Sequence, residues 1–287
     1  FDIQRMGPST GLPTRTSQGD ILSTYYLSHG DTQHPILFPG SVEECFEMAM
    51  KAFDYAEEFQ TLIFVLSDLD LGMNTWMSER FEYPSDSFKR GKVLDQAALE
   101  QVSQFYRYVD VDGDGIPYRT LPGTPHPKAP YFTRGSGHNQ YGQYTEKSAE
   151  WQQNLDRIKR KFETITQCLP LPVIEDNGSH IGLIAFGSTH WAVLEAQDLL
   201  EAQGLKTDYL RIRALPLHPS IENFLHTHDL IYVIEQNRDS QMLQILRSRF
   251  PKEATKMKSI LHYDGSFLDA DVVAQGITLS EQASAVA

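Results

Sequence analysis

One apolar run decides the fold of the second half of the chain: Ile181-Gly182-Leu183-Ile184-Ala185-Phe186, closed by Gly187. A strand without polar alternation is buried on both faces, as strands of parallel sheets are. Residues 189–203 follow with a helical apolar period and end at Gly204, a residue type that commonly closes helices. The residues expected to face inward on that helix are Val193, Ala196, Leu199 and Leu200. This stretch therefore predicts one strand–helix unit of a parallel sheet.

The same alternation continues towards the end of the chain. Strands are predicted at 205–212, 230–235 and 258–262, and helices at 219–227, 238–250 and 267–276. On the helix over 238–250, the residues expected to face inward are Met242, Ile245 and Leu246. Strands that alternate with helices at this spacing form doubly wound parallel sheets. We therefore expect an α/β domain over residues 171–287.

Residues 1–75 also have the pattern of β/α units. A helix is predicted over 17–29, and strands over 35–38 and 61–66. Ser41-Val42-Glu43-Glu44 is a capping box, which starts a helix between these strands. The residues expected on the inner face of that helix are Val42, Cys45, Phe46, Ala49, Phe53 and Ala56. These units are too few to close a domain by themselves, so we expect an open sheet edge.

Residues 76–146 differ in composition, being rich in Pro, Gly, Tyr and Arg with little periodicity. Eight Tyr or Phe residues between Phe105 and Tyr144 argue against disorder. We expect an ordered excursion, followed by an amphipathic helix over 146–168. Residues 76–170 are therefore expected to form a connector between the flanking parts.

The composition of the whole chain excludes several classes of partner. The chain has 287 residues, a formal net charge of −13 and a sequence pI near 5.2. Such a charge repels nucleic acids and anionic membranes. No apolar run approaches the ~20 residues that span a bilayer, and we expect a cytoplasmic protein. Two cysteines, Cys45 and Cys168, are too few to hold an iron–sulfur cluster alone. The chain starts at Phe1, and we expect a fragment.

A short loop near the N-terminus has the composition of an anion site. It reads Arg5-Met6-Gly7-Pro8-Ser9-Thr10-Gly11-Leu12-Pro13-Thr14. Glycine lets a backbone approach a ligand closely, and proline fixes φ. The Arg5 guanidinium suits a carboxylate, and Thr10 and Thr14 offer hydroxyl groups. The alternative interpretation is a turn rich in Gly and Pro with a solvated arginine.

This loop, continued to Asp20, resembles the segment R-x-G-P-S-T-G-x-P-T-x-x-x-Q-x-D of the α subunit of 2-oxoacid:ferredoxin oxidoreductases, the 2-oxoglutarate group in particular. The resemblance covers nearly the whole chain. It includes Leu66-Ser67-Asp68-Leu69-Asp70-Leu71-Gly72-Met73-Asn74, Asp110-Val111-Asp112-Gly113-Asp114-Gly115-Ile116-Pro117-Tyr118-Arg119, Arg134-Gly135-Ser136-Gly137-His138 and Glu235-Gln236-Asn237.

The resemblance implies an enzyme that decarboxylates a 2-oxoacid, passes electrons to ferredoxin and makes an acyl-CoA. It implies thiamine diphosphate with Mg²⁺ and a [4Fe–4S] cluster, both mainly in a partner β subunit, and coenzyme A as co-substrate. Residues 1–75 would be the C-terminal part of a pyrimidine-type thiamine-binding domain, and 171–287 a transketolase C-terminal-like domain. Arg5, with Thr14 and Thr10, would hold the substrate carboxylate.

The family's glutamate that protonates the cofactor's aminopyrimidine ring lies upstream of this loop. We therefore expect no catalytic residue in this chain and no activity of the chain alone. The choice of 2-oxoglutarate over other 2-oxoacids rests on the resemblance alone.

The acidic loop from Asp110 to Gly115 alternates carboxylates with other residues. Asp110, Asp112 and Asp114, with the carbonyl of Ile116, resemble the start of a calcium loop and predict a Ca²⁺ or Mg²⁺ site. Leu121 stands where an EF-hand needs a glutamate. The alternative is a tight turn in which the carboxylates accept backbone N–H groups. Gly113-Asp114-Gly115 with Asn139 also imitates the thiamine diphosphate signature, but in a loop where that signature is not expected.

A second loop, Tyr131 to Tyr144, carries Arg134, His138 and Asn139 between glycines. By resemblance, this loop closes over the active site and limits substrate size. The alternative for His138 is a solvated loop histidine without a special role.

The sequence thus predicts the α-subunit portion of a 2-oxoacid:ferredoxin oxidoreductase with a β-subunit partner. Two alternatives stay open. One is a non-catalytic assembly or metal-binding module that docks a β subunit, and the other is the β chain of a lipoate-linked 2-oxoacid dehydrogenase.

Overall fold

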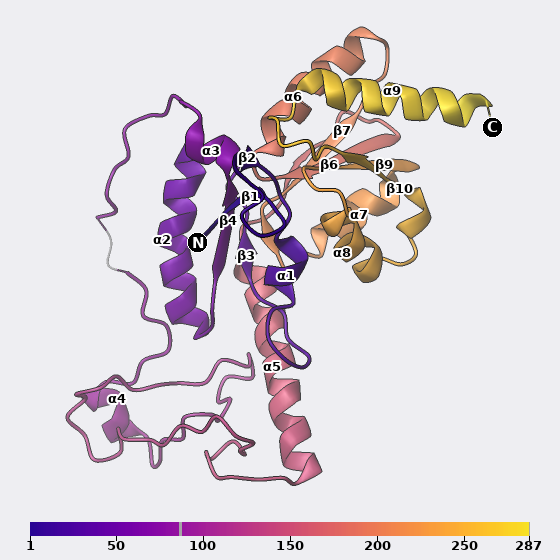
Figure 1. Ribbon diagram of the computed structural model, residues 1–287. Coiled ribbons are helices and arrows are strands. Elements are labelled where there is room, and N and C mark those ends of the chain that lie inside the picture. The colour runs from indigo at the N-terminus through magenta and orange to yellow at the C-terminus, as the bar shows by residue number, and fades with distance from the viewer. Residues whose placement is uncertain (86–87, 287) are drawn as a thin grey trace. The chain divides into compact units, whose positions relative to one another are not determined.

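The structure is a computed structural model that describes residues 1–85 and 88–286 (Figure 1). The chain forms two compact units. Unit 1 comprises Phe1–Ala52, Ile63–Tyr83 and Leu169–Ala287, and unit 2 comprises Phe53–Leu62 and Pro84–Cys168. The domain boundaries expected at residues 75 and 170 stay predictions.

The first sheet of unit 1 has five strands in the order β2-β1-β4-β3-β8. Their bounds are Asp2–Met6 for β1, Leu12–Thr16 for β2, Ile36–Leu37 for β3, Phe64–Asp68 for β4 and Ala214–Leu215 for β8. Strands β1 and β3 pair with β4 in parallel, while β2 and β8 join the two edges in antiparallel fashion. The edge left open by β3 is therefore covered by a strand from the second half of the chain.

The second sheet of unit 1 has the order β10-β9-β6-β7-β5. Its strands are Val173–Glu175 (β5), Ile181–Phe186 (β6), Asp208–Ile212 (β7), Leu230–Glu235 (β9) and Met257–Leu261 (β10). All neighbours pair in parallel except β5, which is antiparallel to β7. The predicted α/β class, with largely parallel sheets, is confirmed.

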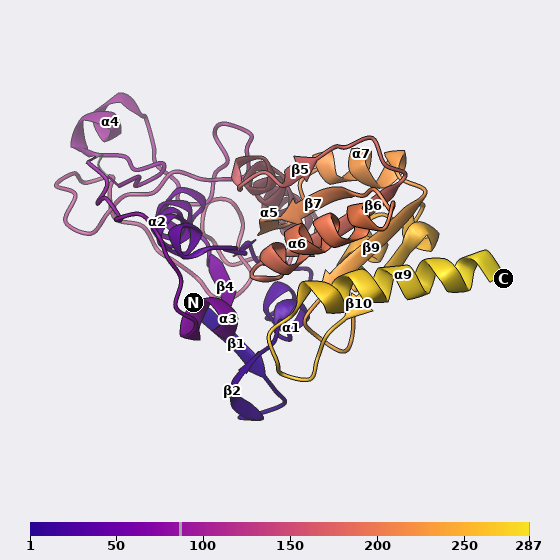
Figure 2. The ribbon, with the colours of Figure 1, turned by 90° about the horizontal axis from the view of Figure 1, so that it is seen from above.

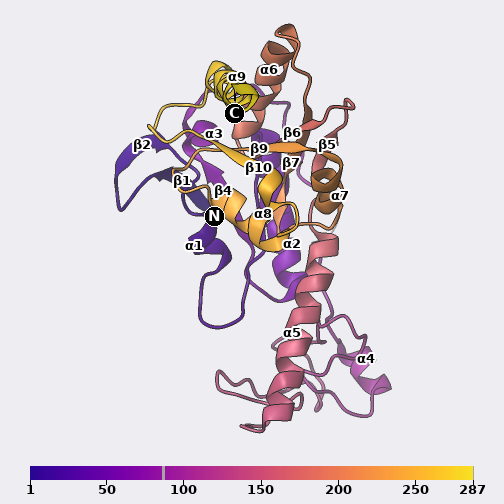
Figure 3. The ribbon, with the colours of Figure 1, turned by 90° about the vertical axis from the view of Figure 1, so that its right-hand side faces the viewer.

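Helices cover both faces of the second sheet, which Figure 3 shows edge-on. Helices α6 (Thr189–Ala202) and α9 (Ala270–Val286) lie on one face, and α7 (Ser220–Thr227) and α8 (Gln241–Arg249) on the other. Val193, Ala196 and Leu200 of α6 share a core with Val273 and Ile277 of α9. The 3-10 helix Ala254–Lys256 precedes β10.

The core on the other face is common to both sheets of unit 1. Ile36 and Leu66 of the first sheet and Ile184 and Ile231 of the second belong to one cluster of buried apolar side chains. Helix α1 (Ile21–Tyr25) contributes residues to the same cluster. Since the two sheets bury their apolar surface together, neither completes this core without the other.

Helix α2 (Val42–Phe59) begins as its capping box predicts, but its buried face differs from the prediction. The Glu44 N–H donates to Ser41 Oγ at 3.2 Å, whereas the Glu44 carboxylate accepts from the Gly40 N–H at 2.7 Å. Phe53, expected to face inward, is 65% exposed, and this expectation was wrong. Met48, Ala52 and Phe59 are buried instead. The buried face of the helix is thus rotated relative to the predicted one, and it lies closer to the side that carries the partly buried Glu44.

Several element bounds also differ from those predicted. The helix expected at 17–29 is only Ile21–Tyr25; before it, the Ser17 hydroxyl and the Gln18 N–H donate to the Gln236 carbonyl. The last helix is longer than expected and runs to Val286. Strands β6 and β9 have the predicted bounds. A short helix, α3 (Leu69–Met73), follows β4 directly.

Unit 2 holds the end of α2 and, among the residues that the structure describes, two further helices, α4 (Gln96–Gln101) and α5 (Ser148–Cys168). The rest is irregular chain with isolated bridges, such as His138 to Tyr144. A small core formed by Leu99, Phe105 and Ala129 orders it. An ordered excursion followed by a long helix was predicted here, and both are present.

Candidate functional site

The predicted anion loop is the tip of a β-hairpin formed by β1 and β2, which projects at the lower edge of Figure 2. The pairing shifts between Arg5 and Met6, which is an irregularity of the bulge type. Gly11 has a φ of +51°, and a Cβ there would clash with the carbonyl oxygen of Met6. The tight turn therefore requires glycine at this position.

Arg5, Thr10 and Thr14 are all exposed on this hairpin. Within the described residues, the Arg5 guanidinium makes no ion pair and no hydrogen bond. Gln4, the residue before it, is buried and donates to the Ser67 carbonyl at 3.3 Å. Its Oε1 also accepts from the Asp20 N–H at 3.1 Å. Gln4 thus fixes the base of the hairpin to β4. The neighbouring Arg5 guanidinium is exposed and has no partner among the described residues.

A second polar cluster lies inside unit 1, where β4, β6 and β9 end. We call it the junction, and its side chains are those of Gln18, Asp68, Ser188, Thr189 and Gln236, each at most 3% exposed. Ser188 Oγ donates to Asp68 Oδ2 at 2.6 Å. Gln236 Nε2 donates to Ser188 Oγ and to Thr189 Oγ1, both at 3.1 Å. Gln18 Oε1 accepts from Thr189 Oγ1 at 3.1 Å and from the Gln236 N–H at 3.2 Å.

No cationic side chain of the described residues forms an ion pair with Asp68, the carboxylate of the junction. Burial raises the pKa of Asp68, although hydrogen bonds from Ser188 and from the N–H groups of Leu71 and Asp70 oppose this. Those two N–H groups belong to the first turn of α3, so Asp68 also caps that helix. Because every member is buried, the junction joins the ends of strands from both sheets and offers no open binding surface.

Sequence reasoning missed the junction, although a signal for it existed. Asp68 and Gln236 each follow a buried strand, and carboxyl ends of neighbouring parallel strands gather polar groups. Glu235, beside Gln236, is also buried, which raises its pKa. Its carboxylate accepts the N–H groups of Met242 and Leu243 at 2.8 and 3.0 Å and so begins α8.

A lysine from another segment of unit 2 lies between the carboxylates of the acidic loop. Lys92 Nζ lies 2.6 Å from Asp112 Oδ2 and 2.7 Å from Asp114 Oδ2, and donates to the Ile116 carbonyl at 3.0 Å. Burial acts to lower the pKa of Lys92, but hydrogen bonds with Asp112 and Asp114 outweigh it and the pKa is raised. An ammonium group thus sits among three of the four residues predicted to bind a metal.

Asp110, the remaining carboxylate, accepts the N–H groups of Gly113 and Gly115, both at 3.0 Å. Asp114 Oδ1 accepts the Ile116 N–H at 2.9 Å. In the described part of the chain, no three His, Cys, Asp or Glu side chains are grouped as metal ligands. The geometry favours the alternative of a turn held by carboxylates, with Lys92 as its cation.

The predicted closing loop is folded by its own polar and aromatic contacts. The Arg134 guanidinium lies 5.4 Å from the Phe132 ring centroid and 5.6 Å from that of Tyr144. The His138 ring stacks on Tyr108, with centroids 4.0 Å apart. Asn139 Oδ1 accepts the N–H groups of residues 141 and 143, at 3.0 and 3.1 Å. Arg134, His138 and Asn139 belong to unit 2, whereas Arg5 belongs to unit 1.

Across the described residues, no helix combines the length and the apolar character that crossing a bilayer requires. Cys45 and Cys168 are both free.

Comparison with protein families gives a match over more than half of the chain. The thiamine diphosphate-binding family of pyruvate flavodoxin/ferredoxin oxidoreductases matches residues 1–164. The α subunit of 2-oxoacid:ferredoxin oxidoreductase 2 from Aeropyrum pernix is 32% identical over 252 residues, which are 85% of this chain and 38% of that protein. The 2-oxoglutarate synthase subunit KorA from Archaeoglobus fulgidus is 25% identical over 250 residues, covering 86% of this chain and 62% of that subunit.

A solved structure is similar along almost the whole chain. It is the 2-oxoglutarate:ferredoxin oxidoreductase from Magnetococcus marinus with 2-oxoglutarate, coenzyme A and succinyl-CoA bound. The TM-score is 0.85 and the identity 26%, over 97% of this chain and 47% of that one. The chain spans between 38% and 43% of the length of several curated relatives that it matches.

Proposed function

Since this chain belongs to the thiamine diphosphate-binding family of pyruvate flavodoxin/ferredoxin oxidoreductases, we propose that it is the α-subunit portion of a 2-oxoacid:ferredoxin oxidoreductase. The complex would oxidatively decarboxylate 2-oxoglutarate to an acyl-CoA and pass the electrons to ferredoxin. The names of the Archaeoglobus fulgidus and Magnetococcus marinus relatives support this substrate over other 2-oxoacids. The family match disfavours a lipoate-linked dehydrogenase.

The observation that carries the proposal is the Arg5 guanidinium, which has no partner among the described residues and lies on a hairpin fixed at its base. A carboxylate needs a cationic group held in place before the substrate arrives, because ordering the group later costs binding free energy. Gln4 and the turn at Gly11 supply that order here. Arg5 would bind the substrate carboxylate through two parallel N–H bonds, and the Thr14 and Thr10 hydroxyls would add donors.

The residues of this chain do not fit the diphosphate end of thiamine diphosphate. The Gly113-Asp114-Gly115 segment lies in a loop, and both oxygens of Asp114 are engaged by Lys92 and the Ile116 N–H. Two cysteines also cannot supply the four thiolates of a [4Fe–4S] cluster. The proposal therefore assigns the diphosphate with Mg²⁺ and the cluster to a β subunit, which would also pass electrons to ferredoxin.

Residues Arg134, His138 and Asn139 are proposed to close over the bound substrate in the assembled enzyme, and the loop that carries them is already ordered by its own contacts. We also propose a cytoplasmic location. Two free cysteines and a net charge of −13 suit a reducing, aqueous compartment.

The test is the Arg5→Lys variant in the complex with its β subunit. Lysine keeps the charge but loses the planar fork, so kcat/KM for 2-oxoglutarate should fall by about tenfold or more. The matched control is Arg80→Lys, an exposed arginine outside the hairpin, which should leave kcat/KM unchanged. If Arg5→Lys and the unaltered complex have the same kcat/KM, Arg5 does not bind the substrate. A complex without CoA-dependent decarboxylation would contradict the proposed function itself.

A further inference from the structure

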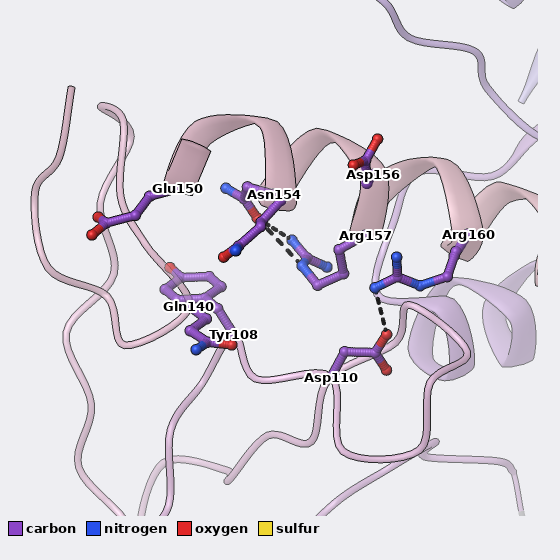
Figure 4. A pocket seen from close by; sticks show the side chains of 9 residues that line it. Tyr108, Asp110, Gln140, Glu150, Asn154, Asp156, Arg157 and Arg160 are labelled. Atoms are coloured by element: carbon purple, nitrogen blue, oxygen red, sulfur yellow. Dashed lines mark hydrogen bonds and ion pairs between the residues drawn. The ribbon is translucent and has the colours of Figure 1, made fainter. Parts of the chain in front are cut away.

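Unit 2 contains a polar pocket that the proposed function does not use. Its volume is about 370 Å³, and Figure 4 shows it below α5. Asn154, Arg157 and Arg160 of α5 line it together with Tyr108, Asp110 and Gln140 from the preceding loops. Pockets of a few hundred Å³ with a small number of convergent polar groups are typical of small-ligand sites.

Arg157 is the central cation of this pocket and has no carboxylate partner among the described residues. Its Nε and Nη2 donate to Asn154 Oδ1 at 3.3 and 3.0 Å, and its Nη1 donates to the Gly115 carbonyl at 3.1 Å. A guanidinium has five N–H donors, so two remain without an acceptor in this part of the chain. Three hydrogen bonds to neutral groups thus hold the guanidinium in place without neutralising it.

The cations around Arg157 are also poorly neutralised. Lys161 Nζ donates to the Gln60 carbonyl at 3.0 Å, and Arg107 donates to Gln60 Oε1 at 2.5 Å, both neutral acceptors. Arg160 has a carboxylate partner, Asp110 Oδ2 at 3.1 Å. Burial lowers the pKa of Lys161 to about 8, and the charges of Arg157 and Arg107 add to the shift. Four cationic side chains, those of Arg107, Arg157, Arg160 and Lys161, therefore cluster in this part of unit 2, in a chain of net charge −13.

The lining contains two further carboxylates, those of Asp156 and Glu150, and neither forms an ion pair with Arg157 or Arg160 among the described residues. Asp156 lies on the opposite side of α5 from Asp110 in Figure 4. Glu150, at the start of α5, is 3.5 Å from Lys147 and accepts from Asn139 at 3.4 Å. Asp110 pairs with Arg160 and not with Arg157 among the described residues, and it also accepts two backbone N–H groups.

We propose that this pocket binds a small oxyanion, a phosphoryl or carboxylate group, between the guanidinium groups of Arg157 and Arg160. Planar guanidinium groups bind both anions through paired N–H bonds. Tyr108 and Gln140 line the same cavity, and their side chains carry a hydroxyl and an amide that can donate hydrogen bonds. The proposal is independent of the substrate site at Arg5, because all the residues that carry it belong to unit 2.

The experiment is calorimetric titration of the full chain with inorganic phosphate and, separately, with malonate, at low and constant ionic strength. Arg160→Gln and Arg157→Gln should each weaken binding about tenfold, which corresponds to the loss of one charge-assisted hydrogen bond. The matched control is Lys159→Gln, which removes one positive charge from an exposed position of the same helix. It should change the affinity less than about twofold, since screened surface charges contribute little.

Binding of phosphate alone identifies a phosphoryl ligand, binding of malonate alone identifies a carboxylate, and binding of both supports the shared chemistry. Absence of binding by either anion overturns the proposal, as does equal weakening by Lys159→Gln. Arg160 is exposed and makes one ion pair, so its variant should keep the fold if Arg157→Gln does not. Unchanged affinity of a folded Arg160→Gln variant also overturns the proposal.

Discussion

Both oxygens of the Glu44 carboxylate accept hydrogen bonds from Arg211, with N–O distances of 2.8 Å. Arg213 adds a third contact at 2.9 Å from Glu44 Oε1. Glu44 lies in α2 and Arg211 in β7, so the pair connects the helix of the first sheet to a strand of the second. Burial acts to raise the pKa of Glu44, but the hydrogen bonds from Arg211 and Gly40 outweigh it, and the pKa is lowered.

Glu44→Gln should destabilise the chain by about 3 kcal/mol, because it leaves two partly buried guanidinium groups without a carboxylate. The free energy of unfolding by urea measures this. Glu47→Gln, an exposed position of the same helix, is the control and should change it by less than about 0.5 kcal/mol. Since the pKa of Glu44 is lowered from 4.5, its contribution is present above that pH and is lost as the pH falls through the folded-state pKa. Equal acid sensitivity of Glu44→Gln and the unaltered chain would contradict this.

The contribution of Asp68 to stability should depend on pH in the opposite direction to that of Glu44. Its pKa is raised from 3.8, so the folded chain holds a proton that the unfolded chain releases, and stability falls as the pH rises above that value. In Asp68→Asn this loss is absent, and the stability of the variant relative to the unaltered chain should increase with pH. Urea titrations between pH 4 and pH 8 measure the difference. Asp31→Asn, which removes a carboxylate at an exposed position, is the matched control.

Asp68→Ala separates hydrogen bonding from charge at the same position. It leaves the Ser188 hydroxyl and the N–H groups of Asp70 and Leu71 without their acceptor, and should cost about 3 kcal/mol. An asparagine Oδ1 can still accept the two N–H groups. A cost of Asp68→Asn as large as that of Asp68→Ala would show that the carboxylate charge itself holds the junction together.

Lys92→Met should make the stability of the chain dependent on calcium. The substitution leaves Asp112 and Asp114 facing each other without the ammonium group, and such a carboxylate set with the Ile116 carbonyl suits a hard cation. We expect a lower melting temperature for the variant and its recovery with CaCl2. The unaltered chain should show no calcium effect, and a rise in its melting temperature with CaCl2 would restore the original metal prediction.

Gly115→Ala should destabilise more than Gly113→Ala, although both residues have positive φ, +83° and +78°. A Cβ at position 113 meets nothing within 4 Å, so that change costs only the backbone strain of about 1 kcal/mol. At position 115 the Cβ would clash with the backbone of Arg157 and Lys161 in α5. Urea denaturation should show an additional loss of about 2 kcal/mol or more. Equal losses of unfolding free energy in the two variants would mean that α5 moves aside at no cost in free energy.

Strands β6 and β9 could be predicted to the residue because their apolar runs are local and bounded by a turn residue or by polar residues. Strands β5 and β8 could not, because each is two or three residues long and exists only through pairing with a distant strand. The position of Lys92 between the carboxylates of the acidic loop could not be predicted, for the same reason. Lys92 lies some twenty residues before Asp112 in an irregular segment, and no periodicity links the two.

In the candidate site too, the part set by one short segment could be predicted, and the part set by distant residues could not. The exposed Arg5 with its tight turn follows from the glycines and prolines of one short segment. The junction depends on Gln18 meeting Gln236, two residues more than two hundred positions apart, through a 2.7 Å bond from the Gln18 N–H to the Gln236 carbonyl. The only indication of this contact in the sequence is that polar residues follow each buried strand.

Strand β8 limits how this protein can be dissected. It follows β7 after one residue, yet pairs with β3 in the other sheet. A cut near residue 170 would leave the N-terminal piece without the strand that covers β3, and the C-terminal piece with a strand that has nothing to pair with. The two halves are therefore not interchangeable modules. A shuffled or recombined gene would have to inherit residues 208–215 together with the segment around β3.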